Sequence, residues 1–485
     1  MIAGPWVLVG LPLAIAPFVY VVRRWAFLGA ALAGGLAAAL AWLCIAAPLF
    51  DPVTLFGRSL LLGQPVAVLG RQLALTSTNQ LALGFLFGLA AVSFLLAWPV
   101  SPGRSFFPLG LTLLSGWTTA LLMRPFAFAG LILWLASILA TMVIQGGRLA
   151  STRGAGRQMV MFTLAVPLLL LSSSLIEARS VNPDDFEQAQ FTILLTAAGL
   201  MILFAAFPFE GWASAVAIDA QPGVVALILS GYQVVVLFLA LDLFRAQPWL
   251  VADGQILSLL ARGGLLTAAI GGGLAAVQRH FASLQGYTAL NDLGTGLVAM
   301  AVAGRTGLTI VFLMVATRAV GLLLSGAGLA VIRSRVQTTS FIKVAGLGRR
   351  LPLATIGLLM GGLSLSGFPL TAGFAARWAL LAQVAPVGGL WVWILLVSNL
   401  GAVIGWLRGA QALFGPADPS TGDVPSIRRT PVIAGILIVI LIVVCLWLGR
   451  RPDWLLLQLR PLVNAYAPFL TAPIFSSLVC DLLPL

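Results

Sequence analysis

Long apolar runs, separated by short links that hold most of the charged residues, follow one another along almost the whole chain. A helix needs about 20 mostly apolar residues to cross the hydrocarbon core of a bilayer. Fourteen runs are long enough or nearly so: 4–22, 25–47, 80–98, 105–123, 126–145, 158–177, 190–207, 221–243, 255–277, 287–304, 306–332, 352–383, 386–413 and 430–449. The pattern predicts an all-α polytopic membrane protein with about fourteen transmembrane helices.

Two places in this pattern interrupt a helix: one follows Phe207, and the other lies inside the run 352–383. The residues that mark the breaks are Pro208, Trp212 and Pro222 in the first and Gly367, Pro369 and Gly373 in the second. A broken helix in a membrane needs protein or a water-filled cavity around its freed backbone groups, and transporters place ion sites at such breaks. For the first break, a tight loop at the membrane surface is an equally good interpretation.

Two stretches do not fit the pattern of spanning runs. The link Asp51–Asn79 has few charges and is rich in Val, Leu and Gly, which indicates a small hairpin lying on the bundle. The tail after Arg451 is apolar but contains three prolines. We expect this tail to lie along the membrane interface or on a partner rather than to cross the bilayer.

Composition agrees with a membrane location. Only 8% of the 485 residues are charged and 60% are hydrophobic, whereas a soluble domain carries roughly 25% charged residues. The three cysteines form neither a disulfide framework nor a metal-spaced pair. The formal net charge of +13 comes from basic residues in short links, where they set topology, so it does not indicate nucleic acid as a partner.

The basic residues are concentrated in alternate links between the predicted helices. Odd-numbered links hold most of them, and the link with Asp184, Asp185 and Glu187 is an even one. Because short basic links stay on the cytoplasmic side, we expect both termini to lie outside a prokaryotic-type cell membrane. Arg450 and Arg451 disagree with this orientation but are outnumbered.

Arginine almost completely replaces lysine in this chain. Lys343 is the only lysine among 27 basic residues, so the other 26 are arginines. Arginine keeps its proton at any ordinary pH, whereas a buried lysine can lose it. The chain therefore excludes a mechanism that needs a deprotonatable lysine inside the membrane, although its arginines can still hold an anion or orient water.

Four blocks of sequence carry a resemblance to a known family. They are Pro208–Trp212 followed by Pro222, Gln278–Ala282 continuing through Gly286–Ala289, Arg318 eight residues before Gly326, and Gly367–Trp378. In this order and at these predicted helices, they make the chain resemble the antiporter-like membrane subunits of respiratory complex I and of Mrp-type cation/proton antiporters. With the helix count, the resemblance covers most of the chain.

The resemblance implies a fold with two inverted five-helix repeats, roughly predicted helices 4–8 and 9–13, each containing one broken helix. We therefore expect four regions along the chain. They are residues 1–104 with three N-terminal helices and the hairpin, 105–250 with the first repeat, 251–415 with the second repeat, and 416–485 with the last helix and the apolar tail.

The chemistry departs from the family pattern. The resemblance implies a proton path with a glutamate on the fifth helix and a lysine on the seventh, continued by titratable residues on the eighth and twelfth. This chain has non-titratable residues at four family positions: Leu135 on the fifth helix, Leu203 on the seventh, Gln233 on the eighth and Ala282 after the Gln278 block. Their loss argues against ordinary pumping.

Glu210, Asp292, Arg318 and Arg377 remain as candidates for a proton or ion path. Arg318 lies in mid-helix, where an unpaired guanidinium is costly enough to suggest function; a structural ion pair, with Asp292 as the plausible partner, is the alternative. For Arg377, a water-path role and an interface anchor are equally good interpretations. Glu210 replaces a family histidine and could titrate if desolvated, but an exposed loop carboxylate is the favoured interpretation.

These observations favour a membrane subunit of a complex I-type (NADH–quinone oxidoreductase) or related ion-translocating complex, contributing to proton translocation coupled to electron transfer to quinone. The subunit itself would be non-catalytic, with no cofactor and no metal of its own. Its partners would be other membrane subunits, the lipid bilayer and protons or cations. Two other classes stay open: a non-conducting structural subunit, and the membrane component of a stand-alone cation/proton or inorganic-carbon transporter.

Overall fold

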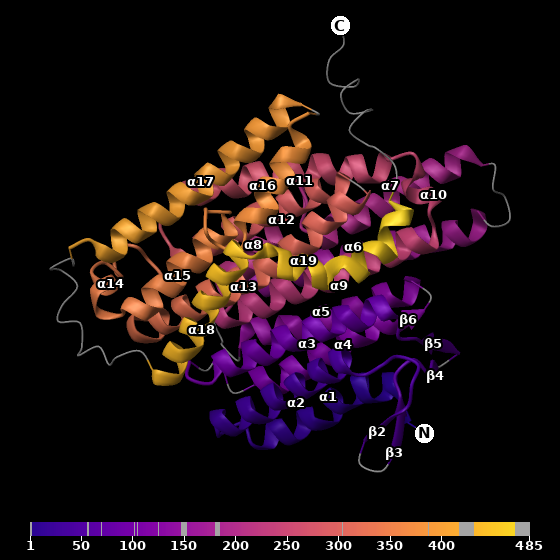
Figure 1. The fold of residues 1–485 in the computed structure, drawn as a ribbon, viewed down its shortest axis with the longest axis horizontal. Helices are drawn as coiled ribbons and strands as arrows, with labels where there is room; N and C mark the ends of the chain where they lie inside the picture. Colours follow the sequence, from indigo (N-terminus) through magenta and orange to yellow (C-terminus); the bar gives the residue numbers. More distant parts are fainter. Residues whose placement is uncertain are drawn as a thin grey trace, which may run out of the picture. The chain divides into compact units, whose positions relative to one another are not determined.

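Helices make up most of the chain in the computed structural model (Figure 1). The structure describes residues 2–55, 58–68, 70–100, 102–103, 105–124, 126–146, 153–179, 185–302, 304–386, 388–416 and 431–470. Within these ranges, eleven helices are long and apolar enough to cross a membrane. The chain is therefore an integral membrane protein, as its apolar runs predicted.

Each of the fourteen predicted runs contains a helix or a pair of helices. The elements are α1 (Gly4–Val21), α2 (Ala26–Ala46), α3 (Ser77–Ala97), α4 (Phe106–Leu122), α5 (Phe126–Gln145), α6 (Arg153–Arg179), α7 (Phe186–Leu203), α8 (Gly211–Asp219), α9 (Pro222–Ala246), α10 (Trp249–Ala252), α11 (Gln255–Val277), α12 (Phe281–Ala301), α13 (Gly304–Val336), α14 (Leu347–Arg350), α15 (Pro352–Leu365), α16 (Phe374–Val384), α17 (Gly389–Phe414), α18 (Val432–Arg450) and α19 (Pro452–Tyr466). The helices α4 and α15 are apolar but have only 17 and 14 residues. The total of fourteen crossings and the inverted repeats stay predictions.

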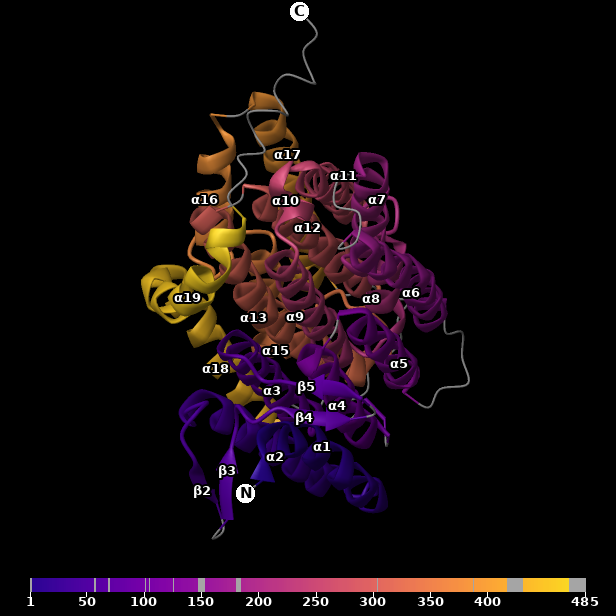
Figure 2. The same ribbon diagram turned by 90° about the vertical axis from the view of Figure 1, so that its right-hand side faces the viewer.

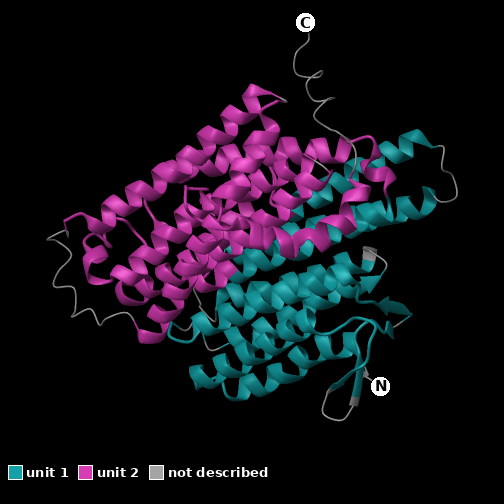
Figure 3. Cartoon of the chain, in the orientation of Figure 1, with its two compact units in different colours: residues 1–203, 227–247 teal, residues 204–226, 248–485 magenta. Residues whose placement is uncertain are grey.

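The chain forms two compact units (Figure 3). Unit 1 contains residues 1–203 and 227–247, and unit 2 contains residues 204–226 and 248–485. The exchange of segments occurs at the first helix break, so α7 belongs to unit 1, α8 belongs to unit 2, and α9 begins in unit 2 and continues in unit 1. The four-region division of the chain stays a prediction.

Unit 1 carries two small sheets beside its helices (Figures 1 and 2). The first has strand order β1-β3-β2, with β1 (Ile2–Ala3), β2 (Val53–Leu55) and β3 (Arg58–Leu61). The second has order β4-β5-β6, with β4 (Val66–Val68), β5 (Arg71–Leu73) and β6 (Met123–Arg124). The single hairpin expected in the link 51–79 is thus two antiparallel hairpins, and each gains a third strand from a distant part of the chain.

In unit 2, α12 is surrounded by other helices of the same unit. It packs against α8, α11, α13, α15 and α17, and 18 of its 21 residues are buried. A helix enclosed by protein does not need an apolar surface for lipid, so it can carry polar side chains. This explains why α12 is not among the helices that are apolar enough to cross a membrane by composition.

The tail after Arg451 begins with a helix, α19, that packs on α13. Leu462, Val463 and Tyr466 are buried, whereas Trp454 and Leu457 are exposed. The chain then returns to the start of α13, where the Gly304 N–H donates to the Leu470 carbonyl at 2.6 Å. An interfacial position of this helix stays a prediction, and residues 471–485 lie outside the described part of the chain.

Candidate functional site

The first helix break is partly enclosed by protein. It connects α7 to α8 through residues 204–210, in which Phe204, Ala205 and Ala206 are buried while Phe207 and Pro208 are exposed. The Phe207 N–H, which has no helical acceptor, donates to the Thr267 hydroxyl of α11 at 2.7 Å. A freed backbone donor therefore finds its partner inside unit 2, as a break within a membrane requires.

The second break connects α15 to α16 through residues 366–373. Gly367 has a φ of +72°, which favours glycine. A Cβ at this position would also lie 2.1 Å from the Cδ of Arg377. The Gly373 N–H donates to the Ser364 hydroxyl at 3.3 Å, which fixes the start of α16 against the end of α15.

Arg377 reaches back from α16 across this break. Its guanidinium donates to the backbone carbonyl of Leu365, the last residue of α15. A cation at this position also faces the negative end of the α15 helix dipole. The side chain is 3% exposed, so the break places a buried positive charge in the interior of unit 2.

Five side chains from four helices meet around this charge. Arg377 donates to the Asp292 carboxylate at 2.9 Å, to the Asn291 amide oxygen at 3.0 Å, and to the Asn399 amide oxygen. Arg318 of α13 donates through Nε to the other Asp292 carboxylate oxygen and through Nη2 to the Asp292 carbonyl at 3.1 Å. We call these five residues, Asn291, Asp292, Arg318, Arg377 and Asn399, the Asp292 cluster.

The structure thus pairs Arg318 with Asp292, which the sequence offered as a plausible partner, and adds Arg377 to the pair. Two guanidinium groups share one carboxylate, which gives the cluster a formal charge of +1. Asp292 and Arg318 are each 5% exposed. Since isolated charges inside a membrane are costly, the carboxylate and the neutral amides stabilise the two cations together.

Glycines of α11 bring the supporting helices close to this cluster. A Cβ on Gly271 would lie 2.5 Å from the Asn291 nitrogen, and a Cβ on Gly272 would lie 2.0 Å from the Ser398 carbonyl. Asn291 in turn donates to the Ala268 carbonyl at 3.0 Å and to the Ser398 hydroxyl at 3.1 Å. These glycines permit close helix packing, and the two hydrogen bonds fix the orientation of the Asn291 amide.

The cluster also approaches the surface of unit 2 through Ser398. A groove of about 320 Å³ lies between α11 and α17, lined by Ala269, Gly273, Trp393, Ile394, Val397 and Ser398. The Ser398 hydroxyl is one hydrogen bond from Asn291 and two from Arg377. A short polar chain therefore connects the groove with the buried charges.

Glu210, the fourth candidate, lies outside the Asp292 cluster. It is half-buried at the start of α8, and one of its carboxylate oxygens is enclosed with no hydrogen-bond partner among the described residues. The fully exposed loop carboxylate that we favoured from the sequence does not describe this environment. Three of the four candidates meet in space, and Glu210 occupies the other break.

The four residues that the resemblance placed at titratable family positions differ in their surroundings. Leu203, Gln233 and Ala282 are buried, whereas Leu135 is 49% exposed on the outer face of α5. The buried face of α5 includes Ser137, and no residue of α5 is acidic. If the family position corresponds to a residue of α5 other than Leu135, that residue is therefore not a carboxylate either.

Neutral polar side chains meet in the interior of unit 1. The Trp117 Nε1, the Gln158 amide and the Tyr232 hydroxyl are buried there with no hydrogen-bond partner among the described residues. The rings of Trp117 and Tyr232 are 5.1 Å apart between centroids. Neither this group nor the roles of Asn291 and Asn399 were predicted from the sequence. A lone amide in an apolar run is the signal by which Asn399 could have been found.

A family model described as the NADH:quinone oxidoreductase/Mrp antiporter transmembrane region matches residues 155–405. The chain belongs to this family. The matched region includes α8, both breaks and the whole Asp292 cluster. The resemblance inferred from the four sequence blocks is therefore confirmed.

Relatives of this chain include subunits N of NADH-quinone oxidoreductase. The protein from Rhodococcus opacus is 26% identical over 60% of this chain and 53% of its own length. The protein from Dehalococcoides mccartyi is 29% identical over 43% of this chain and 44% of its own length. The chain spans about half the length of these two curated relatives.

Solved structures share the fold at low sequence identity. A chain of the Mrp complex from Dietzia sp. has a TM-score of 0.76 at 17% identity, covering 98% of this chain and 99% of that chain. A chain of respiratory complex I from Thermus thermophilus has a TM-score of 0.75 at 19% identity, covering 96% and 100%. This family member therefore has the fold of antiporter-like subunits along almost its whole length.

Proposed function

We propose that this antiporter-like membrane subunit works in a complex I-type or related ion-translocating complex, and that the Asp292 cluster is the charged element of its ion path. The observation that carries the proposal is the position of the cluster, where two arginines share one buried carboxylate at the second helix break. The names of the relatives and the fold of the Mrp and complex I chains support the kind of assembly.

Asp292 is the member of the cluster that can exchange a proton, because arginine stays protonated and the asparagine amides do not titrate. Both of its carboxylate oxygens accept a guanidinium hydrogen bond. The two positive charges oppose the approach of a proton to Asp292, so proton binding is easier when one arginine moves away. We propose that Arg377 moves, because its side chain reaches across the α15–α16 break to the Leu365 carbonyl.

The first half would contribute little charge to this path. Leu135, Leu203 and Gln233 stand where the family has titratable residues, and the polar group of Trp117, Gln158 and Tyr232 is neutral at ordinary pH. Coupling would then come from neighbouring redox or transport subunits, and the chain would need no cofactor of its own. Partners in the membrane, and protons or cations as the conducted species, belong to the same proposal.

A variant series tests the proposal in the intact complex, with electron transfer and ion flux measured separately in proteoliposomes. Asp292→Asn keeps the size of the side chain but removes its charge and its ability to bind a proton. Asp292→Asn also leaves Arg318 and Arg377 without a counter-ion, so assembly is measured first. In the complexes that assemble, we expect a loss of the ion flux that passes through this subunit. The exposed Arg305→Gln is the matched control and should leave flux unchanged.

The flux measurement and a purification of the chain together separate the remaining hypotheses. Unchanged flux per electron in an assembled Asp292→Asn complex would reject the ion path and leave a non-conducting structural subunit. Leu135, Leu203 and Gln233, which do not titrate, also favour that alternative. Purification of the chain without any partner would reject the complex itself. A stand-alone transporter would then be the better assignment.

A further inference from the structure

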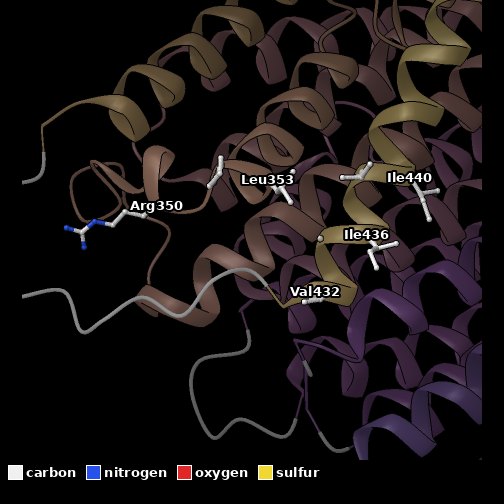
Figure 4. A pocket seen from close by; sticks show the side chains of 8 residues that line it. Arg350, Leu353, Val432, Ile436 and Ile440 are labelled. Carbon is white, nitrogen blue, oxygen red and sulfur yellow. The ribbon is translucent and has the colours of Figure 1, made fainter.

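An apolar groove lies between α15 and α18 in unit 2. It has a volume of about 610 Å³ and is lined by Pro352 and Leu353 of α15 and by Val432, Gly435, Ile436, Val439 and Ile440 of α18, with Arg350 at one end. In Figure 4, Val432, Ile436 and Ile440 follow one side of α18, and the Arg350 side chain extends away from them. With respect to the described part of the chain, the apolar lining residues other than Gly435 are all exposed.

A second pocket shares Arg350 with this groove. It has a volume of about 440 Å³ and is lined by Ala345, Gly346, Leu347, Arg349, Arg350, Phe414, Gly415 and Pro416. Both arginines are exposed. Two guanidinium groups at one pocket can form several hydrogen bonds to a phosphate, because the guanidinium plane matches the phosphate oxygens.

The local backbone adds positive potential between the two pockets. Arg350 ends α14, and α15 begins two residues later at Pro352 with no side chain capping its N-terminus. The N-terminus of a helix carries partial positive charge and stabilises anions. From the second pocket to the groove the surface changes from basic to apolar, and Arg350 lines both.

We infer that the two pockets form one binding site for an anionic phospholipid. The phosphate group binds Arg349 and Arg350, and one acyl chain lies in the groove between α15 and α18. Both volumes fall in the range of roughly 300–1,000 Å³ that is usual for small-molecule sites. Basic pockets next to membrane-crossing helices are the surfaces that bind anionic headgroups. A zwitterionic lipid offers the same acyl chain without the net negative charge, so the arginines select against it.

The full-length chain, purified in mild detergent and loaded into nanodiscs, provides the test. The measured quantity is the apparent affinity for phosphatidylglycerol and for phosphatidylcholine, obtained by native mass spectrometry or by displacement of a labelled lipid. We expect phosphatidylglycerol to bind at least five-fold more tightly. Arg349→Gln with Arg350→Gln should remove this preference, whereas the exposed Arg305→Gln should keep it.

Two further measurements distinguish a lipid site from its alternatives. Glycerol phosphate has the headgroup charge without the acyl chain. If it displaces the labelled lipid with the same apparent affinity as phosphatidylglycerol, the groove has no role in binding. Equal binding of the two lipids by the unchanged chain, or an unchanged preference in the double variant, would overturn the site. In the assembled complex, a partner subunit that covers both pockets with no lipid present would also overturn it.

Discussion

At the scale of single residues, the carboxylate of Asp292 is the group on which the interior of unit 2 depends. It accepts hydrogen bonds from Arg318 of α13 and from Arg377 of α16. Removal of one partner of a buried ion pair leaves an uncompensated charge, which is worse than replacing the whole pair. Removal of the carboxylate should therefore lower the stability more than removal of one arginine.

We expect Asp292→Ala to lower the free energy of unfolding by about 3–5 kcal/mol, because it leaves two buried cations without a counter-ion. Arg318→Met should cost less, since Asp292 remains paired with Arg377 and the excess positive charge disappears. Unfolding by heat or denaturant in detergent, followed by tryptophan fluorescence, measures both. If Asp292→Ala is no more harmful than Arg305→Gln, the cluster does not stabilise the fold.

The pairing of these residues could be foreseen only in part. An arginine and an aspartate in neighbouring apolar helices made an ion pair between them plausible, because a charge alone in a membrane is costly. Arg377 was left undecided, because its partners include the Leu365 carbonyl and depend on how the chain turns at residues 366–373. The pattern of hydrophobic residues does not predict backbone geometry of this kind.

At the scale of elements, the glycine run of α11 determines how closely three helices approach. Gly271 faces α12 and Gly272 faces α17, whereas a Cβ on Gly273 meets nothing within 4 Å. Three adjacent residues of one type therefore have different structural roles. Small residues at helix interfaces permit close backbone approach in membranes.

We expect Gly272→Ala to push α17 away from α11 and so to weaken the hydrogen bond between Asn291 and Ser398. The loss of stability should reach about 1–3 kcal/mol, the usual range for overpacking in a close-packed interior. Gly273→Ala is the matched control and should change stability by less than about 0.5 kcal/mol. Equal melting temperatures for the two variants would mean that the helices do not depend on this contact.

The apolar runs located the helices well, and the misses have local causes. The predicted run 287–304 begins six residues after α12 does, because the first turns of that helix contain polar residues that protein rather than lipid covers. The run 190–207 extends beyond the end of α7 at Leu203, because apolarity continues through the break. The third strands of the two sheets, β1 and β6, were not predicted because their partners are distant in sequence.

At the scale of the whole molecule, the basic links predict which side of the membrane each end faces. The link after α13 contains Arg349 and Arg350, and the link between α9 and α11 belongs to the opposite, less basic set. Positive charges in short links determine orientation. The lipid site inferred above would then face the cytoplasmic leaflet, where anionic lipids give a negative surface potential.

Cysteine labelling in intact cells measures this orientation. We expect Ala252→Cys, in the link before α11, to react with a membrane-impermeant maleimide from outside. Ile342→Cys, in the basic link after α13, should react only after the membrane is opened. Both positions are exposed, and Cys44 and Cys445 are buried, so background labelling can be subtracted using the unchanged chain. Reversed labelling would reverse the predicted topology.

The burial of α12 has a consequence for the biosynthesis of the chain. An aspartate at the centre of a helix adds about 2.5–3.5 kcal/mol to the free energy of membrane insertion, so α12 is a poor substrate for insertion on its own. Only the link 278–280 separates it from the apolar α11, and the two helices can enter the bilayer together as a hairpin. Arg318 follows Asp292 by 26 residues and Arg377 follows it by 85. During synthesis, Asp292 therefore meets Arg318 first, and the cluster is completed only when α16 arrives.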